Sequence, residues 1–381
     1  MTPSLQILQA TRINAIMGTL QDARLLPQQL RFLARTPVIP AIDSEILASY
    51  QGYVYIADLI ADDATAVAYN TGKFVLEANS VPNLKIGTPL TQAMLNQLNA
   101  LVSNLASAED RVMFLEWEAR TVDSLLLGVR QRMEALLVAM HVGGLTYERL
   151  GIKMSNVTWG RPSDLNVTPG TGWDTAGSAT PVSDILTVKR LAQIRYGVTY
   201  DRVTMSTQAF MYMIATTEFQ NKARNFIPAN VSFTNIATEN LQAMQNLAER
   251  TLGMTIELYD ARYWYQTPAG AVASAPYLPI VKVILSSTQD DNDPTAADFA
   301  NGVVTESIVG SLASTAMVGN LGGARRGPIA YATVPPDLNP PNVTYWGVAR
   351  GFPRLHRKQM SACLTIGAFS DTIAATEPSI A

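Results

Sequence analysis

The residues of this chain that could do chemistry are few and lie far apart. The two histidines are His141 and His356, and neither has a second histidine or a cysteine at the spacing of a zinc site. A loose carboxylate cluster consists of Asp290, Asp291, Asp293 and Asp298. An EF-hand needs alternating acids, a central glycine and a terminal glutamate, and Pro294 breaks that pattern. We therefore predict no metal site and interpret the acidic segment as a solvated loop.

Motifs for nucleotide binding and for covalent catalysis are also missing. The chain contains no GxxxxGK[ST] motif, no GxGxxG after a strand and no GxSxG. The glycine-rich segment 319–326 is better explained as a connection than as an anion-binding loop. Cys363, the only cysteine, lies in the apolar run 360–366, which is typical of a small buried side chain. We name no catalytic, cofactor-binding or metal-binding residue, and we expect a protein that is not an enzyme and needs no cofactor.

Composition indicates where else the function could reside. Of the 381 residues, 48% are hydrophobic and only 15% are charged, against about 25% charged in an average protein. Either partners cover much of the surface, or the surface is rich in uncharged polar side chains. The net charge of −3 argues against general binding to polyanions. No apolar run reaches the roughly 18 residues of a membrane span, so we expect no membrane contact. A single cysteine fits a reducing compartment.

The first 36 residues form a basic arm that ends at Thr36-Pro37 and Pro40. Against the single acid Asp22, the arm carries Arg12, Arg24, Arg31 and Arg35. These arginines could contact nucleic acid or pair with acidic neighbours, and the second use is the commoner one for scattered arginines.

Residues 45–88 are predicted to form an extended, hairpin-like loop. Two β-rich runs, 53–56 and 73–77, bracket a polar tip at Asn70-Thr71-Gly72. The loop has few residues for a core of its own, so we expect it to lie on another surface. The large side chains for that contact are Tyr53, Tyr55, Phe74 and Leu76.

One long helix, from residue 107 to 142, organises the chain around these segments. Apolar residues recur every three or four positions from Val112 to Met140 and so form one stripe, and Gly143-Gly144 supplies a stop. At 1.5 Å per residue the helix is roughly 50 Å long. The pattern also fits a coiled coil. We favour a helix lying across a sheet, because Ala119 interrupts the stripe and the flanking positions lack regular charge pairs.

The rest of the chain is predicted to alternate helices with strands. A Gly/Pro/Thr-rich stretch at 160–181 marks a boundary, and 183–290 reads as a compact α/β or α+β domain. Two late strands, 343–351 and 357–368, have period-two stretches that need a partner. We expect both late strands to pack on the long helix, which needs a sheet for its apolar stripe.

Two groups of residues resemble a known family. The first is Val157-Thr158-Trp159-Gly160-Arg161 followed by Gly172-Trp173-Asp174. The second is the closing segment 345–353, Tyr-Trp-Gly-Val-Ala-Arg-Gly-Phe-Pro, followed by 359–366. Together with the order of arm, loop, long helix and later domains, they resemble the lambda major head protein (major capsid protein E) family of tailed bacteriophages. The match covers most of residues 40 to 370.

The resemblance implies an α+β fold of the Hong Kong 97 type. Residues 1–36 would be its N-terminal arm and 45–88 its extended loop. Residues 89–160 plus 335–375 would form a peripheral domain that carries the spine helix 107–142, and 183–330 would form the axial domain.

The resemblance also implies a major capsid protein of the virion, assembled in the host bacterial cytoplasm. Its copies would form hexamers and pentamers of an icosahedral shell around double-stranded DNA, with portal, scaffolding or decoration proteins as further partners. Neighbouring subunits would contact Tyr53, Tyr55, Phe74 and Leu76. The inner-surface contacts to DNA would be Arg12, Arg24, Arg31 and Arg35. Two alternatives remain at this point: a coiled-coil scaffold or filament protein, and an α+β enzyme whose site is built from unremarkable residues within 183–290.

Overall fold

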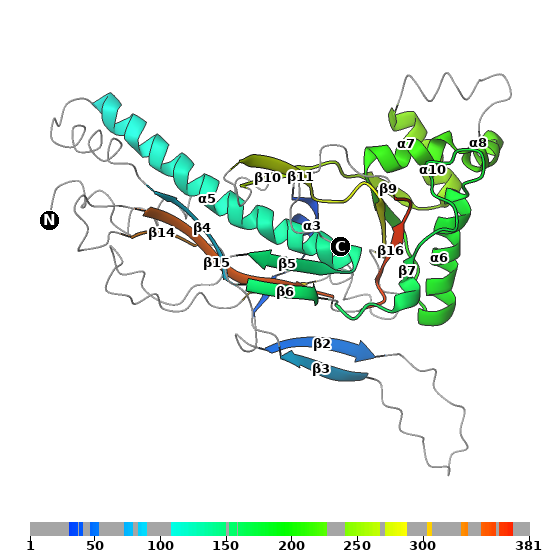
Figure 1. Cartoon of the computed structure of the whole chain (residues 1–381), viewed down its shortest axis with the longest axis horizontal. Coiled ribbons are helices and arrows are strands. Elements are labelled where there is room, and N and C mark those ends of the chain that lie inside the picture. Colours follow the sequence, from blue (N-terminus) through cyan, green and yellow to red (C-terminus); the bar gives the residue numbers. More distant parts are fainter. Residues whose placement is uncertain are drawn as a thin grey trace, which may run out of the picture.

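The structure is a computed structural model. It describes residues 30–36, 38–40, 46–52, 72–78, 83–89, 108–149, 152–157, 159–226, 241–266, 271–287, 303–306, 329–333, 344–355 and 358–368. The long helix α5 (Ala108–Val142) runs diagonally through the body, with one strand layer beneath it and a second, helix-covered sheet at its C-terminal end (Figure 1).

The first sheet lies under α5 and is built around the long strand β15 (Thr344–Arg354). One end of β15 pairs with β13 (Val303–Glu306), which in turn pairs with β1 (Val38–Pro40). The other end lies between β14 (Ile329–Thr333) and β4 (Asn83–Pro89). The helix packs on β15 closely, because Gly347 has no side chain: a Cβ there would lie 2.9 Å from the Leu125 carbonyl oxygen.

Burial along α5 shows how its apolar stripe is used. Val122, Leu126 and Val129 are buried along one side, and from Met133 to Val142 every residue is buried on all sides. The helix therefore starts as a rod on a sheet and ends inside a core. Its stripe is covered within the subunit, so the coiled-coil alternative is not supported, and the prediction of a sheet-backed helix is confirmed.

The second sheet has the strand order β7-β16-β12-β8-β9. Its strands are β7 (Asn166–Val167), β16 (Ser361–Thr365), β12 (Lys282–Ser286), β8 (Arg202–Met205) and β9 (Thr255–Leu258). The strand β12 runs antiparallel to β16 and β8, whereas the two outer pairs are parallel. The helices that accompany it are α6 (Pro181–Tyr196), α7 (Thr207–Ala215), α8 (Thr217–Ala223) and α10 (Leu241–Leu252).

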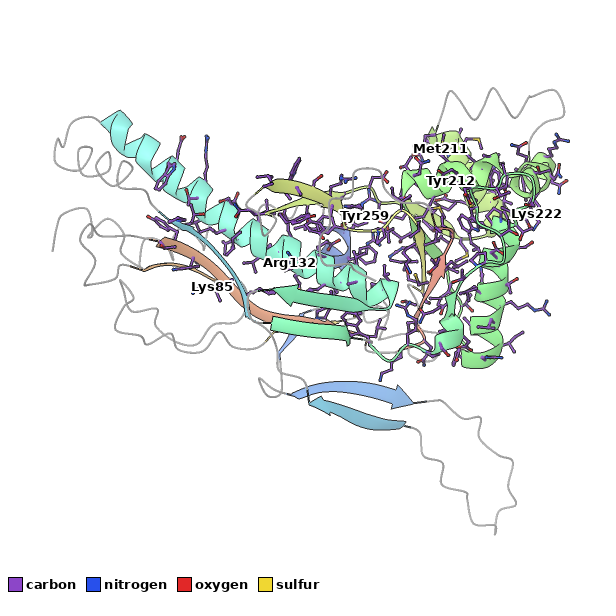
Figure 2. The ribbon with its side chains drawn as sticks, viewed as in Figure 1. Lys85, Arg132, Met211, Tyr212, Lys222 and Tyr259 are labelled. Atoms are coloured by element: carbon purple, nitrogen blue, oxygen red, sulfur yellow. The ribbon has the colours of Figure 1, made fainter. Side chains whose placement is uncertain are left out.

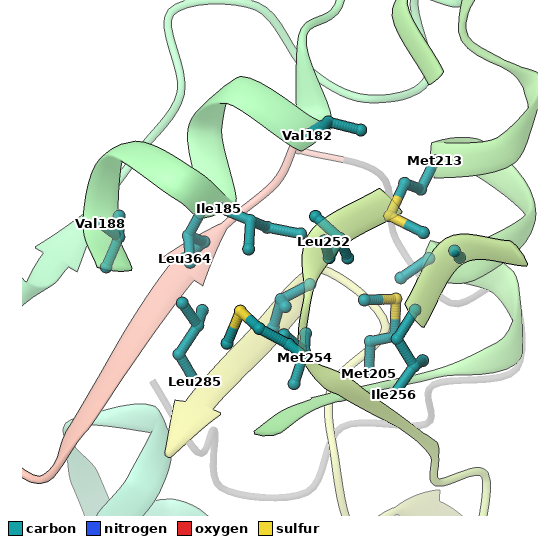
Figure 3. Close-up of a cluster of buried hydrophobic side chains, with 14 of the residues drawn as sticks. Val182, Ile185, Val188, Met205, Met213, Leu252, Met254, Ile256, Leu285 and Leu364 are labelled. Carbon is teal, nitrogen blue, oxygen red and sulfur yellow. The ribbon is translucent and has the colours of Figure 1, made fainter. Parts of the chain in front are cut away.

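Alternation along β12 lets the second sheet serve two cores. Val283 and Leu285 point into the cluster beneath α6 and α10, shown in Figure 3, whereas Ile284 belongs to the cluster around the end of α5. Successive strand residues face opposite sides of a sheet. The sheet is thus the wall that joins the helical domain to the long helix.

The sheets do not follow the domain division expected from the sequence. The strand β16 lies within the expected peripheral segment 335–375, yet it pairs with β12 of the second sheet. Conversely, β13 lies within the expected axial segment 183–330 but pairs with β15 under α5. Both late strands contact the long helix, as expected, but β16 lies between β7 and β12 of the second sheet. The physical reason is that β16 is buried along nearly its whole length, which suits a strand between two neighbours.

The expected extended loop 45–88 is shorter in the structure. A hairpin forms between β2 (Ile46–Gly52) and β3 (Gly72–Ala78), with Tyr50 opposite Phe74. The predicted run 53–56 lies outside the described residues. Residues 83–88 belong to β4, which pairs with β15 over seven positions and lies against α5, so they are part of the body.

Three smaller pieces complete the described fold. The hairpin β10–β11 (Arg262–Gln266 and Val272–Pro276) lies along the upper side of α5 in Figure 1, and the hairpin β5–β6 (Leu145–Arg149 and Ile152–Val157) follows the end of α5. The short helix α3 (Arg31–Arg35) contacts α5. Single 3₁₀ turns lie at Ser163–Leu165 and Arg224–Phe226.

Candidate functional site

The root of the N-terminal arm is held on the long helix by a buried carboxylate. The short helix α3 has Leu30 at its N-cap, and no side chain of the helix caps its first N–H groups. Glu134 of α5 takes that role, because its Oε1 accepts from Phe32 N at 3.0 Å and its Oε2 accepts from Leu33 N at 2.6 Å. At the other end of α3, Thr36 Oγ1 donates to the Phe32 carbonyl oxygen at 2.6 Å.

The electrostatics of Glu134 reflect its position inside the core. Its side chain is fully buried, and this burial raises its pKa above the ordinary value, although bonds from Phe32 and Leu33 oppose the rise. The Tyr259 hydroxyl donates to Glu134 Oε1 at 2.8 Å. Burial and the neighbouring carboxylate raise the pKa of Tyr259, so this phenol stays a donor. A buried carboxylate with three donors is a structural anchor for the arm.

A second carboxylate, Glu257 on β9, binds the arm from the side. Arg35 donates to both of its oxygens, with Nη1 at 2.8 Å from Oε2, and Arg31 Nη1 lies 3.1 Å from Oε1. Arg31 Nη1 also donates to the Leu258 carbonyl oxygen at 2.9 Å. Burial would raise the pKa of Glu257, but hydrogen bonding to Arg35 and the nearby positive charges hold it below the ordinary value.

Aromatic rings fill the space between these two carboxylates. The Phe32 ring lies 5.2 Å from the His141 ring and 5.7 Å from the Tyr259 ring, and Tyr259 stacks on Tyr277 at 6.1 Å. Figure 2 shows Arg132 on α5 and Tyr259 next to this helix, in the middle of the molecule. Arg132 in turn lies over the Tyr263 ring, 5.8 Å from its centroid. The arm root is therefore fastened by apolar contact as well as by charge.

The C-terminal end of α5 is capped by an arginine that sequence reasoning did not single out. Arg161 Nη2 donates to the carbonyl oxygens of Met140 and His141, at 2.8 and 2.6 Å, and its Nη1 donates to Asn166 Oδ1. His141 lies in the last turn of α5, and its side chain is fully buried against Phe32. The available signal was Arg161 in the Gly160-Arg161 turn, 19 residues after the end of the helix at Val142.

The predicted contact residues fall in different parts of the structure. Arg31 and Arg35 come together on Glu257, which is the acidic-neighbour use weighed from the sequence. Phe74 and Leu76 lie in β3, paired with Tyr50 and Ala48 of β2. The predicted residues that lie outside the described part of the chain are Arg12, Arg24, Tyr53 and Tyr55. Contact with DNA or with a neighbouring subunit therefore stays a prediction for all of them.

The described residues are arranged to hold segments together. Among them, no group of three or more His, Cys, Asp or Glu side chains could hold a metal ion. No helix within the same ranges is long and apolar enough to cross a membrane. Cys363 lies buried in β16, as the sequence predicts, and burial raises the pKa of its thiol. The geometry of the described residues therefore supports docking of the arm root on the body.

Comparisons with known proteins agree with this interpretation. A family model described as phage major capsid protein E matches residues 47–295. The structure of a protein described as a prophage capsid protein of E. coli CFT073 has a TM-score of 0.56 at 13% identity, covering 94% of this chain and 99% of that chain. A phage-related protein from Bordetella bronchiseptica RB50 has a TM-score of 0.50 at 11% identity, covering 92% and 96%. No curated protein matches the chain.

Proposed function

This chain belongs to the phage major capsid protein E family, and from that premise we propose how its parts build a shell. It is a major capsid protein that self-associates into an icosahedral shell and has its place in the virion. Its fold is the α+β Hong Kong 97-type capsid fold that the resemblance implied. The family is structural, and neither the filament nor the enzyme alternative is supported.

The hairpin β2–β3 is the observation that carries the proposal. Its two strands pair only with each other among the described strands, and in Figure 1 the hairpin lies apart from both sheets. A two-stranded hairpin by itself is at best marginally stable in water. We propose that the hairpin and the segment 53–71 between its strands lie on a neighbouring subunit. The proposed contacts are Tyr53, Tyr55, Phe74 and Leu76.

The two sheets supply the proposed domains. The peripheral domain would be α5 with the sheet around β15, which includes β1, β4, β13 and β14. The axial domain would be the sheet around β12 with α6, α7, α8 and α10, and it would surround the centres of hexamers and pentamers. The arm root, bound to Glu134 and Glu257, would join the two domains within one subunit.

The remaining partners follow from the role of a phage shell. We propose that the shell encloses double-stranded DNA through weak, non-specific contacts, and that it assembles in the host bacterial cytoplasm with portal and scaffolding or decoration proteins. Arg12 and Arg24 would be the arm residues available to DNA. Arg31 and Arg35 would contact DNA only with the part of each guanidinium that Glu257 leaves open. Phosphate contacts of this kind weaken with added salt.

A deletion tests the role of the hairpin. Replacing residues 46–78 by a short glycine-serine linker removes β2 and β3 but keeps β4, which belongs to the body sheet. We expect a folded subunit that sediments slowly and forms no shells. Circular dichroism and urea unfolding check that α5 and both sheets remain folded.

A matched variant shortens only the segment between the strands, replacing 53–71 and leaving β2–β3 paired. This variant distinguishes a subunit contact made by the strands β2 and β3 from a contact made by residues 53–71. Normal shells from the 46–78 replacement, seen by electron microscopy, would refute the proposed role of the hairpin.

A further inference from the structure

A cavity at the arm root has more positive charge than its carboxylates balance. It has a volume of about 370 Å³ and lies where α3, β8, β9 and α10 meet. The residues that decide its chemistry are Arg31, Arg35, Arg202, Gln245, Thr255 and Glu257.

The carboxylate in the cavity is already saturated. Glu257 Oε1 accepts from Arg31 and Arg35, and its Oε2 accepts from Arg35 and from Thr204 Oγ1 at 3.3 Å. A carboxylate offers about four acceptor sites. Gln245 is also engaged, because its Nε2 donates to the Ile256 carbonyl oxygen at 2.6 Å.

Arg202 is the arginine of the cavity whose hydrogen bonds are incomplete. Its Nη1 is buried and has no hydrogen-bond partner among the described residues. Its neighbours include Arg35, whose charge repels it, and the carboxylates of Glu257 and Asp201. Three guanidinium groups therefore line the cavity, and its one lining carboxylate, Glu257, is fully used. An unpaired buried donor is costly, although the Arg202 side chain as a whole is only half-buried.

We propose that this cavity binds a phosphate-class oxyanion. Guanidinium groups donate in planar forks that match the oxygens of phosphate. A tetrahedral oxyanion has enough oxygens to accept from all three arginines at once, whereas a carboxylate has two. The phosphate would pair with the accessible part of the Arg202 guanidinium and balance the excess charge of the cavity. It could come from free phosphate or from the phosphodiester backbone of DNA, and the inference does not depend on the hairpin's role in assembly.

Titration calorimetry of the purified full chain tests the proposal. Sodium phosphate is titrated at constant ionic strength, with sodium acetate and a short DNA duplex as parallel ligands. We expect saturable binding of phosphate, of the duplex, or of both. Arg202→Gln should weaken it at least tenfold, whereas Arg190→Gln, on an exposed position of α6, should not change it.

The arms of the experiment distinguish the two sources. Phosphate binding without duplex binding assigns the site to the free ion, and duplex binding that depends on Arg202 assigns it to DNA. Should Arg202→Gln fail to fold, Arg202→Lys keeps the charge but loses the fork, and it should also bind more weakly. The proposal would be overturned if the wild-type chain shows no saturable binding, or if it binds acetate as tightly as phosphate. It would also be overturned if Arg202→Gln binds phosphate and the duplex as tightly as the wild type.

Discussion

Glu134 is a carboxylate placed where α5 is otherwise surrounded by apolar side chains. Burial of a charge is unfavourable unless hydrogen bonds compensate for it. Here two backbone N–H groups of α3 and the Tyr259 hydroxyl do so, at 2.6 to 3.0 Å. The residue therefore makes the position of the arm specific, because the N-cap residue Leu30 offers no side-chain cap for the first N–H groups of α3.

Replacing Glu134 by glutamine should destabilise the subunit. The amide keeps one acceptor oxygen but turns an NH₂ group toward a backbone N–H, which leaves a buried donor unsatisfied. We expect a loss of about 1–3 kcal/mol in the free energy of unfolding, measured by urea titration. Glu116→Gln, on the exposed part of the same helix, is the control and should change it by less than about 0.5 kcal/mol. Equal effects of the two substitutions would contradict the anchoring role.

Glu257 should make the subunit sensitive to acid. Burial would raise its pKa, but Arg35 and Arg31 hold the pKa below 4.5. A carboxyl group whose pKa is lower in the folded chain adds stability above its unfolded value, and this is lost as the pH falls through the folded value. Glu257→Gln should thus be less stable than wild type at neutral pH, and the difference should shrink as the pH falls below 4.5.

Urea midpoints at neutral pH and at about pH 3 measure this difference. Glu116→Gln again serves as the control, and its urea midpoint should stay close to that of the wild type at both pH values. Because both variants keep Glu134, whose pKa shift has the opposite sign, its contribution cancels in the comparison. A gap between wild type and Glu257→Gln that stays constant over this range would show that Glu257 gains nothing from its arginines.

At the scale of elements, close contact between α5 and β15 depends on a missing side chain. The Leu125 carbonyl oxygen would lie 2.9 Å from a Cβ at Gly347, and the Leu125 Cβ would lie 3.0 Å from it. Backbone atoms on a long helix cannot move aside cheaply. The glycine in the closing segment is therefore a packing requirement of this helix and sheet.

Gly347→Ala should separate α5 from the sheet. We expect a loss of about 1–3 kcal/mol in the free energy of unfolding, typical of overpacking. Gly177→Ala is the matched control, because no atom lies within 4 Å of a Cβ there. Thermal unfolding of both variants checks the prediction, and a Gly347→Ala subunit as stable as the control would contradict it.

The edge strand β9 shows how elements avoid unwanted pairing. Its outer edge is occupied by side chains: Glu249 Oε1 accepts from Ile256 N at 3.0 Å, and Gln245 Nε2 donates to the Ile256 carbonyl oxygen. Arg31 donates to the Leu258 carbonyl oxygen. Exposed edges invite association between sheets. A covered edge here is consistent with contacts between subunits being made elsewhere, as proposed for β2–β3.

For the whole molecule, the low content of charged residues fits a subunit of a shell, where neighbouring copies cover part of its surface. The free subunit exposes several large apolar side chains, among them Trp264 and Val272 on the β10–β11 hairpin. Aromatic residues are enriched where proteins meet. The body is well packed, whereas the β2–β3 hairpin pairs with no other described strand. We therefore expect assembly to cover the hairpin with a neighbouring subunit.

Hydrogen exchange should show whether assembly covers the β2–β3 hairpin. In free subunits, the amides of β2 and β3 should exchange much faster than those of the central strand β12, because no other strand of the described residues pairs with the hairpin. In assembled shells the hairpin should become protected, while β12 stays protected in both states. Mass spectrometry of peptides covering 46–52, 72–78 and 282–286 measures this. Unchanged exchange of the hairpin on assembly would argue that it is not an interface.

The sequence alone was enough to predict the long helix, its backing by a sheet, the α+β class and the family. Those features depend on local periodicity, as along Val122, Leu126 and Val129, or on short motifs around Trp159 and Trp346. Cys363 as a buried side chain was predictable for the same reason, since its neighbours are apolar.

Only the tertiary structure decided which distant segments meet. The pairing of β16 with β12 joins residues 75 or more positions apart. The pairing of β4 with β15 joins residues 255 or more positions apart, and the capping of α3 by Glu134 spans 101 positions. Strand pairing and the burial of a single carboxylate depend on hydrogen bonds between distant segments. A local sequence pattern does not predict which segment will supply those hydrogen bonds. For that reason Glu134 looks like any other helix residue in the sequence, and its role appears only once Phe32 and Leu33 lie beside it.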